Sequence, residues 1–140
     1  EGALLGQMGN PGNAPGQLSE PTDLLADRFG VYYVLEAYSH RVQLLDSWGG
    51  SLGLWDMPPS IAYDGPHATW APDGSLLMTA PEERAILRYT PDGRLLDRWG
   101  LANGFPFQKP VGLYLDTPSG RLFVTDTQAH QVHLFQVELP

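Results

Sequence analysis

Residues 30–46, GVYYVLEAYSHRVQLLD, decide the fold of this chain because the sequence contains this unit three times. The three copies begin at Gly30, Gly74 and Gly120, so they are spaced 44 and 46 residues apart. Each copy is an apolar run that follows a glycine, then a polar turn, and then a second apolar run. Short alternating runs of this kind predict β-strands joined by tight turns.

A repeat of this period, built from short strands and glycine turns, is typical of the blades of a β-propeller. We predict a single all-β domain with three four-stranded blades and little or no helix. Residues 21–57 and 66–100 are two complete blades, whereas residues 110–140 supply only the first three strands of a third. The opening segment EGALLGQMG, residues 1–9, aligns with DGRLLDRWG, residues 92–100, which is the predicted last strand of a blade. Residues 1–9 are therefore predicted to be the last strand of the split blade.

Three blades cannot close into a ring, because propellers have about four to eight blades. An open half-ring would leave two apolar blade faces in water. We therefore expect a homodimer that forms one six-bladed ring, with strand exchange between the termini. In this arrangement residues 1–9 of one chain complete the third blade of the other. The alternative is that the chain is half of a propeller whose other blades belong to a longer protein.

Composition limits the classes of partner. The 140 residues contain 16 acidic and 8 basic side chains, and the net charge of −8 argues against nucleic acid as a partner. No apolar run approaches the roughly 20 residues of a membrane span, so none is expected. The absence of cysteine excludes disulfides and thiol chemistry. The compartment stays open, although the start at Glu1 rather than Met favours an extracytoplasmic location if a leader was removed.

The repeat resembles the NHL repeat of six-bladed propellers. The third copy matches its pattern best, with Pro110-Val-Gly112, then GRLFVTD at 120–126, then HQVHLF at 130–135. The first copy has Glu36 at the position of the acid, and the second copy has Ala80 there and Arg84 in place of histidine. The resemblance implies a propeller that binds partners. It also implies an alternative, because amidating-lyase relatives are enzymes that hold a metal with histidines.

Strand direction predicts where a binding site would lie. Successive antiparallel strands reverse, so the turns between second and third strands lie on the same face as the long loops between blades, where function usually sits. The first strands should line the central axis, which places Asp23, His67 and Gly112 near a channel. The candidate ligand-binding residues are Asp23, Tyr38, His40, His67, Glu82, Arg84, Gln128 and His130.

Several of these residues have a structural interpretation as well. His40 and His130 occupy the same repeat position and would be a metal pair only with further ligands. Arg84 interrupts any ring of such ligands, so we predict no metal and instead expect these histidines to pack beside the strands that they precede. Glu36 and Asp126 end second strands, where a carboxylate can accept hydrogen bonds from turn amides; a role as a general base is the alternative.

Large aromatic residues lie in or beside the segments that join the blades, and most should fill the space between blades, although a surface patch for a partner is the alternative. These residues are Trp48, Trp55, Trp99, Phe105 and Phe107.

Three functions of different classes remain. The favoured one is a non-catalytic binding or scaffold propeller that recognises a protein, peptide or glycan through one loop face or the channel. The others are a metal-dependent propeller enzyme of the amidating-lyase type and a half-propeller fragment without an independent function. The sequence contains no GxGxxG motif, and we expect no cofactor.

Overall fold

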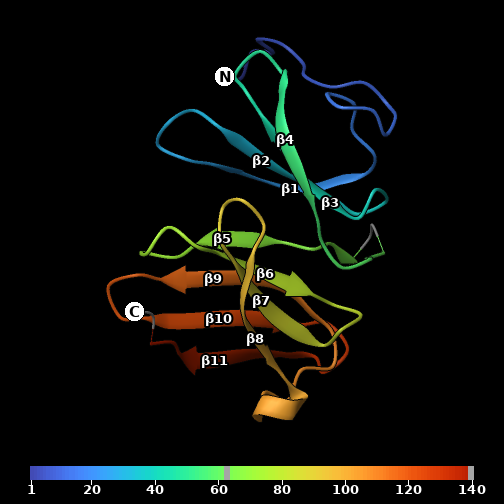
Figure 1. The fold of residues 1–140 in the computed structure, drawn as a ribbon. Coiled ribbons are helices and arrows are strands. Elements are labelled where there is room, and N and C mark those ends of the chain that lie inside the picture. The colour runs from blue at the N-terminus through green and yellow to red at the C-terminus, as the bar shows by residue number, and fades with distance from the viewer. Residues whose placement is uncertain (62–63, 139–140) are drawn as a thin grey trace.

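The computed structural model describes residues 1–61 and 64–138, which fold into three antiparallel sheets (Figure 1). The first sheet has the strand order β1-β2-β3-β4. Its strands are β1 (Pro21–Ala26), β2 (Tyr32–Glu36), β3 (Arg41–Leu45) and β4 (Ser51–Asp56). Each strand is paired with its neighbour in the chain, as in a propeller blade.

The second sheet repeats this order with β5 (Ala68–Trp70), β6 (Leu76–Ala80), β7 (Ala85–Tyr89) and β8 (Leu95–Gly100). A short 3₁₀ turn, η2 (Leu101–Asn103), begins the connection to the third sheet. That sheet contains β9 (Pro110–Asp116), β10 (Arg121–Asp126) and β11 (Gln131–Gln136). The all-β fold with three blades is confirmed. Residues 139–140, the end of the third predicted blade, lie outside the described residues.

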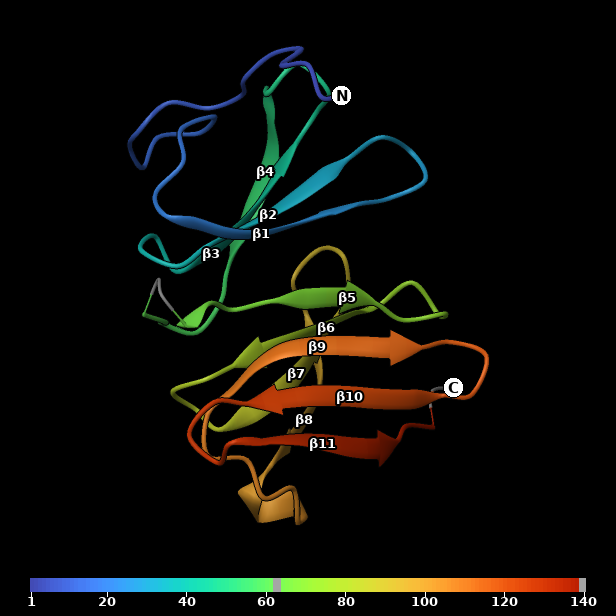
Figure 2. The ribbon, with the colours of Figure 1, turned by 180° about the vertical axis from the view of Figure 1, so that it is seen from behind.

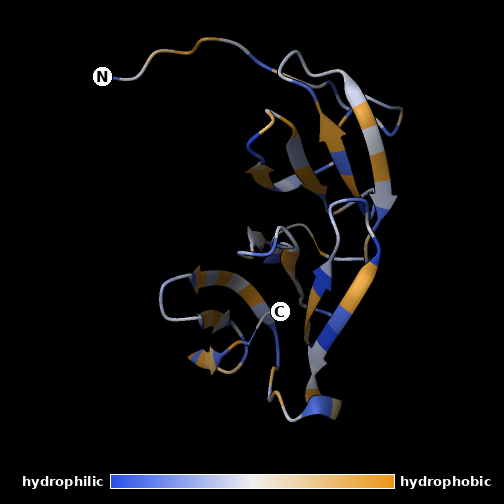
Figure 3. Ribbon diagram, turned by 60° about the vertical axis from the view of Figure 1, so that its left-hand side comes forward, coloured by the Kyte–Doolittle hydropathy of each residue, from blue (hydrophilic) through white to orange (hydrophobic). Residues whose placement is uncertain are grey.

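Residues 1–9 belong to no sheet in the described part of this chain. Figure 3 shows this segment leaving the first blade as an extended arm. The predicted pairing of this segment with another chain is therefore not visible in one chain and stays a prediction. Among the described residues, no helix is long and apolar enough to span a membrane.

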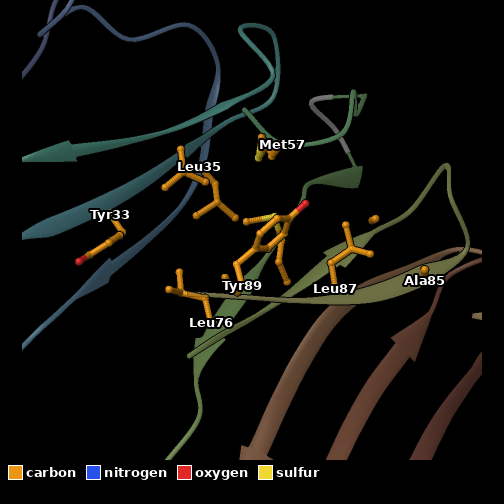
Figure 4. Close-up of a cluster of buried hydrophobic side chains, with 11 residues drawn as sticks. Tyr33, Leu35, Met57, Leu76, Ala85, Leu87 and Tyr89 are labelled. Carbon is orange, nitrogen blue, oxygen red and sulfur yellow. The ribbon is translucent and has the colours of Figure 1, made fainter. Parts of the chain in front are cut away.

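Two apolar clusters hold the blades together, one at each junction. Between the first and second blades, Leu35 and Met57 lie in one cluster with Leu76 and Leu87 (Figure 4). Between the second and third blades, Leu77 and Ile86 pack against Leu122 and Val124. Both faces of the second blade are thus covered, and every residue of the strands β6 and β7 is buried for this reason.

The aromatic residues of the connecting segments mostly fill the junctions, as expected. Trp55 lies against Tyr89 of the next blade with ring centroids 4.9 Å apart. Phe105 and Phe107 pack on Phe135 at 4.8 and 5.3 Å. Trp48 is the exception at 92% exposed, because it sits in the hairpin turn between β3 and β4 rather than at a junction.

The first strands of the three blades lie side by side, as Figure 2 shows for β1, β5 and β9. Threonine hydroxyls of β1 and of the second strand β6 link neighbouring blades along this edge. The Thr22 hydroxyl donates to the carbonyl of Pro66 at 2.8 Å, and the Thr79 hydroxyl donates to the carbonyl of Val111 at 2.8 Å. Each bond joins one blade to the next along the inner edge of the half-ring.

Candidate functional site

Asp23 and His67 meet at the inner edge, where β1 and β5 begin. The carboxylate oxygen Oδ2 of Asp23 lies 3.4 Å from Nδ1 of His67. The two residues hold the same repeat position, because the next residues, Leu24 and Ala68, pair with equivalent partners on the second strands. Their side chains are 26% and 38% exposed, so both remain accessible to a ligand. The structure thus brings together two of the predicted site residues that are far apart in the sequence.

The charge of Asp23 is fixed by its hydrogen bonds. Burial opposes ionisation, but contacts from His67 and from the backbone amides of Ala68 and Leu24 outweigh it and lower the pKa of the carboxyl group. The amide of Ala68 donates to Oδ2 and the amide of Leu24 donates to Oδ1, each at 2.8 Å. Asp23 is therefore an anion at neutral pH and is held in place at the blade junction.

His67 is positioned by features that the sequence analysis missed. Its backbone amide donates to the hydroxyl of Thr79 at 2.9 Å. Gly65 has a φ of +68°, and a Cβ atom there would come within 2.7 Å of the ring atoms Cδ2 and Nε2 of His67. Only glycine therefore tolerates both this backbone conformation and the ring beside it. Gly65, two residues before His67, is the sequence feature that could have indicated this site.

The other predicted site residues lie on the exposed turns between second and third strands and do not converge into one cluster. They are Tyr38, His40, Glu82, Arg84, Gln128 and His130, and all are exposed. Glu82 accepts a hydrogen bond from the amide of Ile61 at 3.0 Å. Among the described residues no group of three His, Cys, Asp or Glu side chains is placed to hold a metal ion.

The shared position of His40, Arg84 and His130 has a backbone explanation. All three are left-handed, with φ of 53°, 52° and 54°. The expectation that the histidines pack beside the following strands is wrong, because their side chains are exposed. What repeats is the left-handed residue that ends the turn, a conformation in which histidine is enriched among non-glycine residues.

Glu36 and Asp126 accept hydrogen bonds from loop amides, as predicted. Ser19 N–H donates to Glu36 at 2.9 Å, whereas Gln108 and Lys109 N–H both donate to Asp126 at 2.8 Å. These equivalent carboxylates attach the segment that enters each blade to the end of its second strand. The observed contacts are structural, and neither carboxylate adds to the Asp23–His67 pair.

A hollow of about 460 Å³ lies between the hairpin turns of the first two blades, on the face opposite the longer loops. Its lining is Ala26, Asp27, Arg28, Phe29, Tyr33, Trp70, Ala71, Pro72, Asp73, Gly74 and Pro91. It contains short turns, whereas the Asp23–His67 pair lies on the side of the longer loops. The pair is therefore the stronger candidate for binding.

Comparison with known proteins supports the fold. Residues 107–135 match the family model of the NHL repeat, which confirms the resemblance for the third blade. No curated protein matched the sequence of this chain.

Solved structures of propeller-like proteins are similar to this chain. A Bacteroides caccae protein of unknown function is 14% identical over 81% of this chain and 44% of its own, with a TM-score of 0.67. Virginiamycin B lyase from Staphylococcus aureus is 16% identical over 84% of this chain and 41% of its own, with a TM-score of 0.57. Hydrazine synthase from Kuenenia stuttgartiensis is 12% identical over 96% of this chain and 36% of its own, with a TM-score of 0.64.

At these low sequence identities, the similarity establishes only the fold of this chain. The chain spans less than half of the length of each of these proteins. Some of the similar proteins are lyases by name, so the likeness does not decide between binding and catalysis.

Proposed function

We propose that this chain is a non-catalytic binding propeller that recognises a protein, peptide or glycan at the face bearing the longer loops. The observation that carries the proposal is the Asp23–His67 pair, an anion and an imidazole that are 3.4 Å apart and partly exposed at the inner edge. The ionised carboxylate and the net charge of −8 favour a basic peptide among these ligands. Exposed residues of the turns on the same face, such as Tyr38 and Gln128, would provide further contacts for a larger ligand.

A displayed library of random peptides, selected on the purified chain, tests this proposal. We expect the selected peptides to be enriched in Lys or Arg and to lose about tenfold or more in affinity with Asp23→Asn, since a lost charge-assisted hydrogen bond costs about 1.5–3 kcal/mol. Asp92→Asn is the matched control, because this exposed carboxylate lies on a hairpin turn of the opposite face. Peptides that bind the Asp23→Asn and His67→Ala variants as tightly as the wild type would contradict the proposal.

The enzyme alternative has a separate test. A metal-dependent lyase would need three or more convergent ligands, whereas Asp23 and His67 supply two. Metal analysis of the purified protein should find no stoichiometric zinc or calcium. One equivalent of either metal, lost in His67→Ala, would favour the enzyme.

We also propose that the binding unit is a homodimer, with two half-rings forming one six-bladed ring. The exposure of equivalent residues supports this. Val132 is 63% exposed, whereas Val42 and Ile86 at the same repeat position are 0% exposed against a following blade. Light scattering should give a mass of twice 15.4 kDa at micromolar concentration. A stable monomer would favour the alternative, in which the other blades belong to a longer protein.

A further inference from the structure

The third blade presents a face that is built to meet another blade. We call it the leading face, and it consists of Tyr114, Phe123, Thr125, Val132 and Leu134. The equivalent face of the second blade, with Leu77 and Ile86, is buried by the third blade. On the third blade the same positions line an open hollow of about 220 Å³.

The first blade presents the opposite partner of such a junction, which we call the trailing face. Leu24 on this face is 53% exposed, whereas its equivalent in the second blade, Ala68, is 8% exposed. A largely apolar hollow of about 480 Å³ opens here, lined by Met8, Leu18, Pro21, Thr22, Asp23, Leu24, Tyr32, Val34 and Leu45. One chain thus carries both halves of an interface that it already forms twice internally, and a second copy of the same chain supplies the complement of each.

The inner edge specifies the stagger of this junction. The Thr79 hydroxyl donates to the carbonyl of Val111 on the following first strand. Thr125 is the equivalent of Thr79, because these residues pair with Val132 and Ile86 at the same repeat position. Its hydroxyl would reach the equivalent carbonyl on the next first strand, which is that of Thr22. In a closed ring, Gly112 of one copy is then followed at the axis by Asp23 of the other.

The outer edge of the third blade indicates how residues 1–9 would pair with β11. β11 is paired only with β10 among the described strands, so one edge of its ladder is free. In the second blade that edge is occupied by β8, with Ile86 opposite Trp99 and Leu87 opposite Arg98. Residues 1–9 align with this strand and are exposed, with Leu4 and Leu5 82% and 97% accessible. Transferring the pairing puts Met8 opposite Val132 and Gln7 opposite His133.

We infer that two copies of this chain exchange residues 1–9, each arm adding antiparallel to β11 of the other copy with Met8 opposite Val132, while the leading face of each copy packs on the trailing face of the other. This inference rests on the proposed homodimer. The exchange joins main-chain hydrogen bonds to apolar burial at two identical junctions, which closes the ring and leaves no free edge on either third blade.

Disulfide trapping tests the register, because the chain has no cysteine of its own. Directly opposed residues of antiparallel strands have Cα atoms about 4.5–5.5 Å apart, within disulfide range. The Met8→Cys/Val132→Cys variant should give a covalent dimer on oxidation that reduction reverses. Gln7→Cys/Val132→Cys is the matched control, since successive side chains point to opposite faces, and it should give at least tenfold less.

The outcomes separate this inference from the proposal beneath it. Light scattering could show a wild-type dimer while both cysteine variants are trapped equally or neither is trapped. This result would overturn the register but keep the dimer. A wild-type monomer would overturn both. Deletion of residues 1–9 should convert the dimer to a monomer with an unchanged β-sheet circular dichroism spectrum. A deletion variant that dimerises as tightly as the wild type would overturn the exchange.

Discussion

At the scale of single residues, Glu36 and Arg41 form a buried ion pair, 2.8 Å apart. The Arg41 guanidinium also donates to the carbonyls of Asn13 and Gln17 at 2.7 and 2.9 Å, so the pair attaches the entering segment to the first blade. Arg41→Met leaves Glu36, which is 0% exposed, without its partner, and should lower the free energy of unfolding by about 3–5 kcal/mol.

Urea denaturation measures this effect. The double variant Glu36→Gln/Arg41→Met should recover much of the loss, because no buried charge is then left alone. Arg94→Met, at an exposed site on a turn, should change stability by less than about 0.5 kcal/mol. If Arg41→Met also changed stability by less than about 0.5 kcal/mol, the ion pair would not hold the entering segment.

Asp126 should make the protein sensitive to acid. Burial opposes its ionisation, but hydrogen bonds from the amides of Gln108 and Lys109, and from His133, outweigh burial and lower the pKa of Asp126. The unfolded value is about 3.9, so the carboxylate contributes stability that is fully present above about pH 4–5. This stability is lost as the pH falls through the folded pKa.

Urea midpoints measured from pH 7 down to about pH 3 test this prediction. Asp126→Asn should be less stable than the wild type at neutral pH. It should also lose less stability between pH 5 and pH 3, because its unfolding takes up about one proton fewer. Two variants with the same dependence on pH would show that Asp126 is not responsible.

At the scale of elements, two turns with the same sequence differ because one is open to solvent and the other contacts the preceding blade. Pro72-Asp-Gly74 and Pro91-Asp-Gly93 both end on a left-handed glycine, with φ of 84° and 90°. A Cβ at Gly74 would meet nothing within 4 Å, whereas one at Gly93 would lie 2.4 Å from Cγ of Trp55 in the preceding blade. The second turn is therefore part of the blade junction.

Alanine substitutions separate backbone strain from packing. Gly74→Ala should cost about 1–2 kcal/mol through the left-handed conformation alone. Gly93→Ala should cost a further 1–3 kcal/mol, roughly, because the methyl group displaces Trp55 from Tyr89. Thermal unfolding and the near-ultraviolet circular dichroism of the aromatic side chains provide the measurements. Equal losses in the two variants would contradict a packing role for the second turn.

At the scale of the whole molecule, the charge distribution argues against nucleic acid. The chain has twice as many acidic as basic side chains, and the surplus repels a phosphate backbone. Fluorescence anisotropy with a labelled single-stranded RNA should give no submicromolar binding at about 150 mM salt. Tight binding that weakens steeply as salt is raised would contradict this prediction.

The three blades, their strands and the hydrogen-bonding roles of Glu36 and Asp126 could be predicted from the sequence. These features depend on local information, because strand alternation, turn glycines and a repeated period are readable from neighbouring residues. The same local pattern explains one error, since the repeat position of His40 and His130 reflects backbone conformation rather than side-chain packing. Trp48 lies in a hairpin turn and is the exception among aromatic residues that mostly fill junctions.

The contacts between blades could not be predicted from the sequence and are known from the folded structure. The contact of Asp23 with His67, the bond from Thr79 to Val111 and the approach of Gly93 to Trp55 all join different repeats. These contacts depend on the stagger and spacing of packed sheets, which no pattern within one repeat specifies.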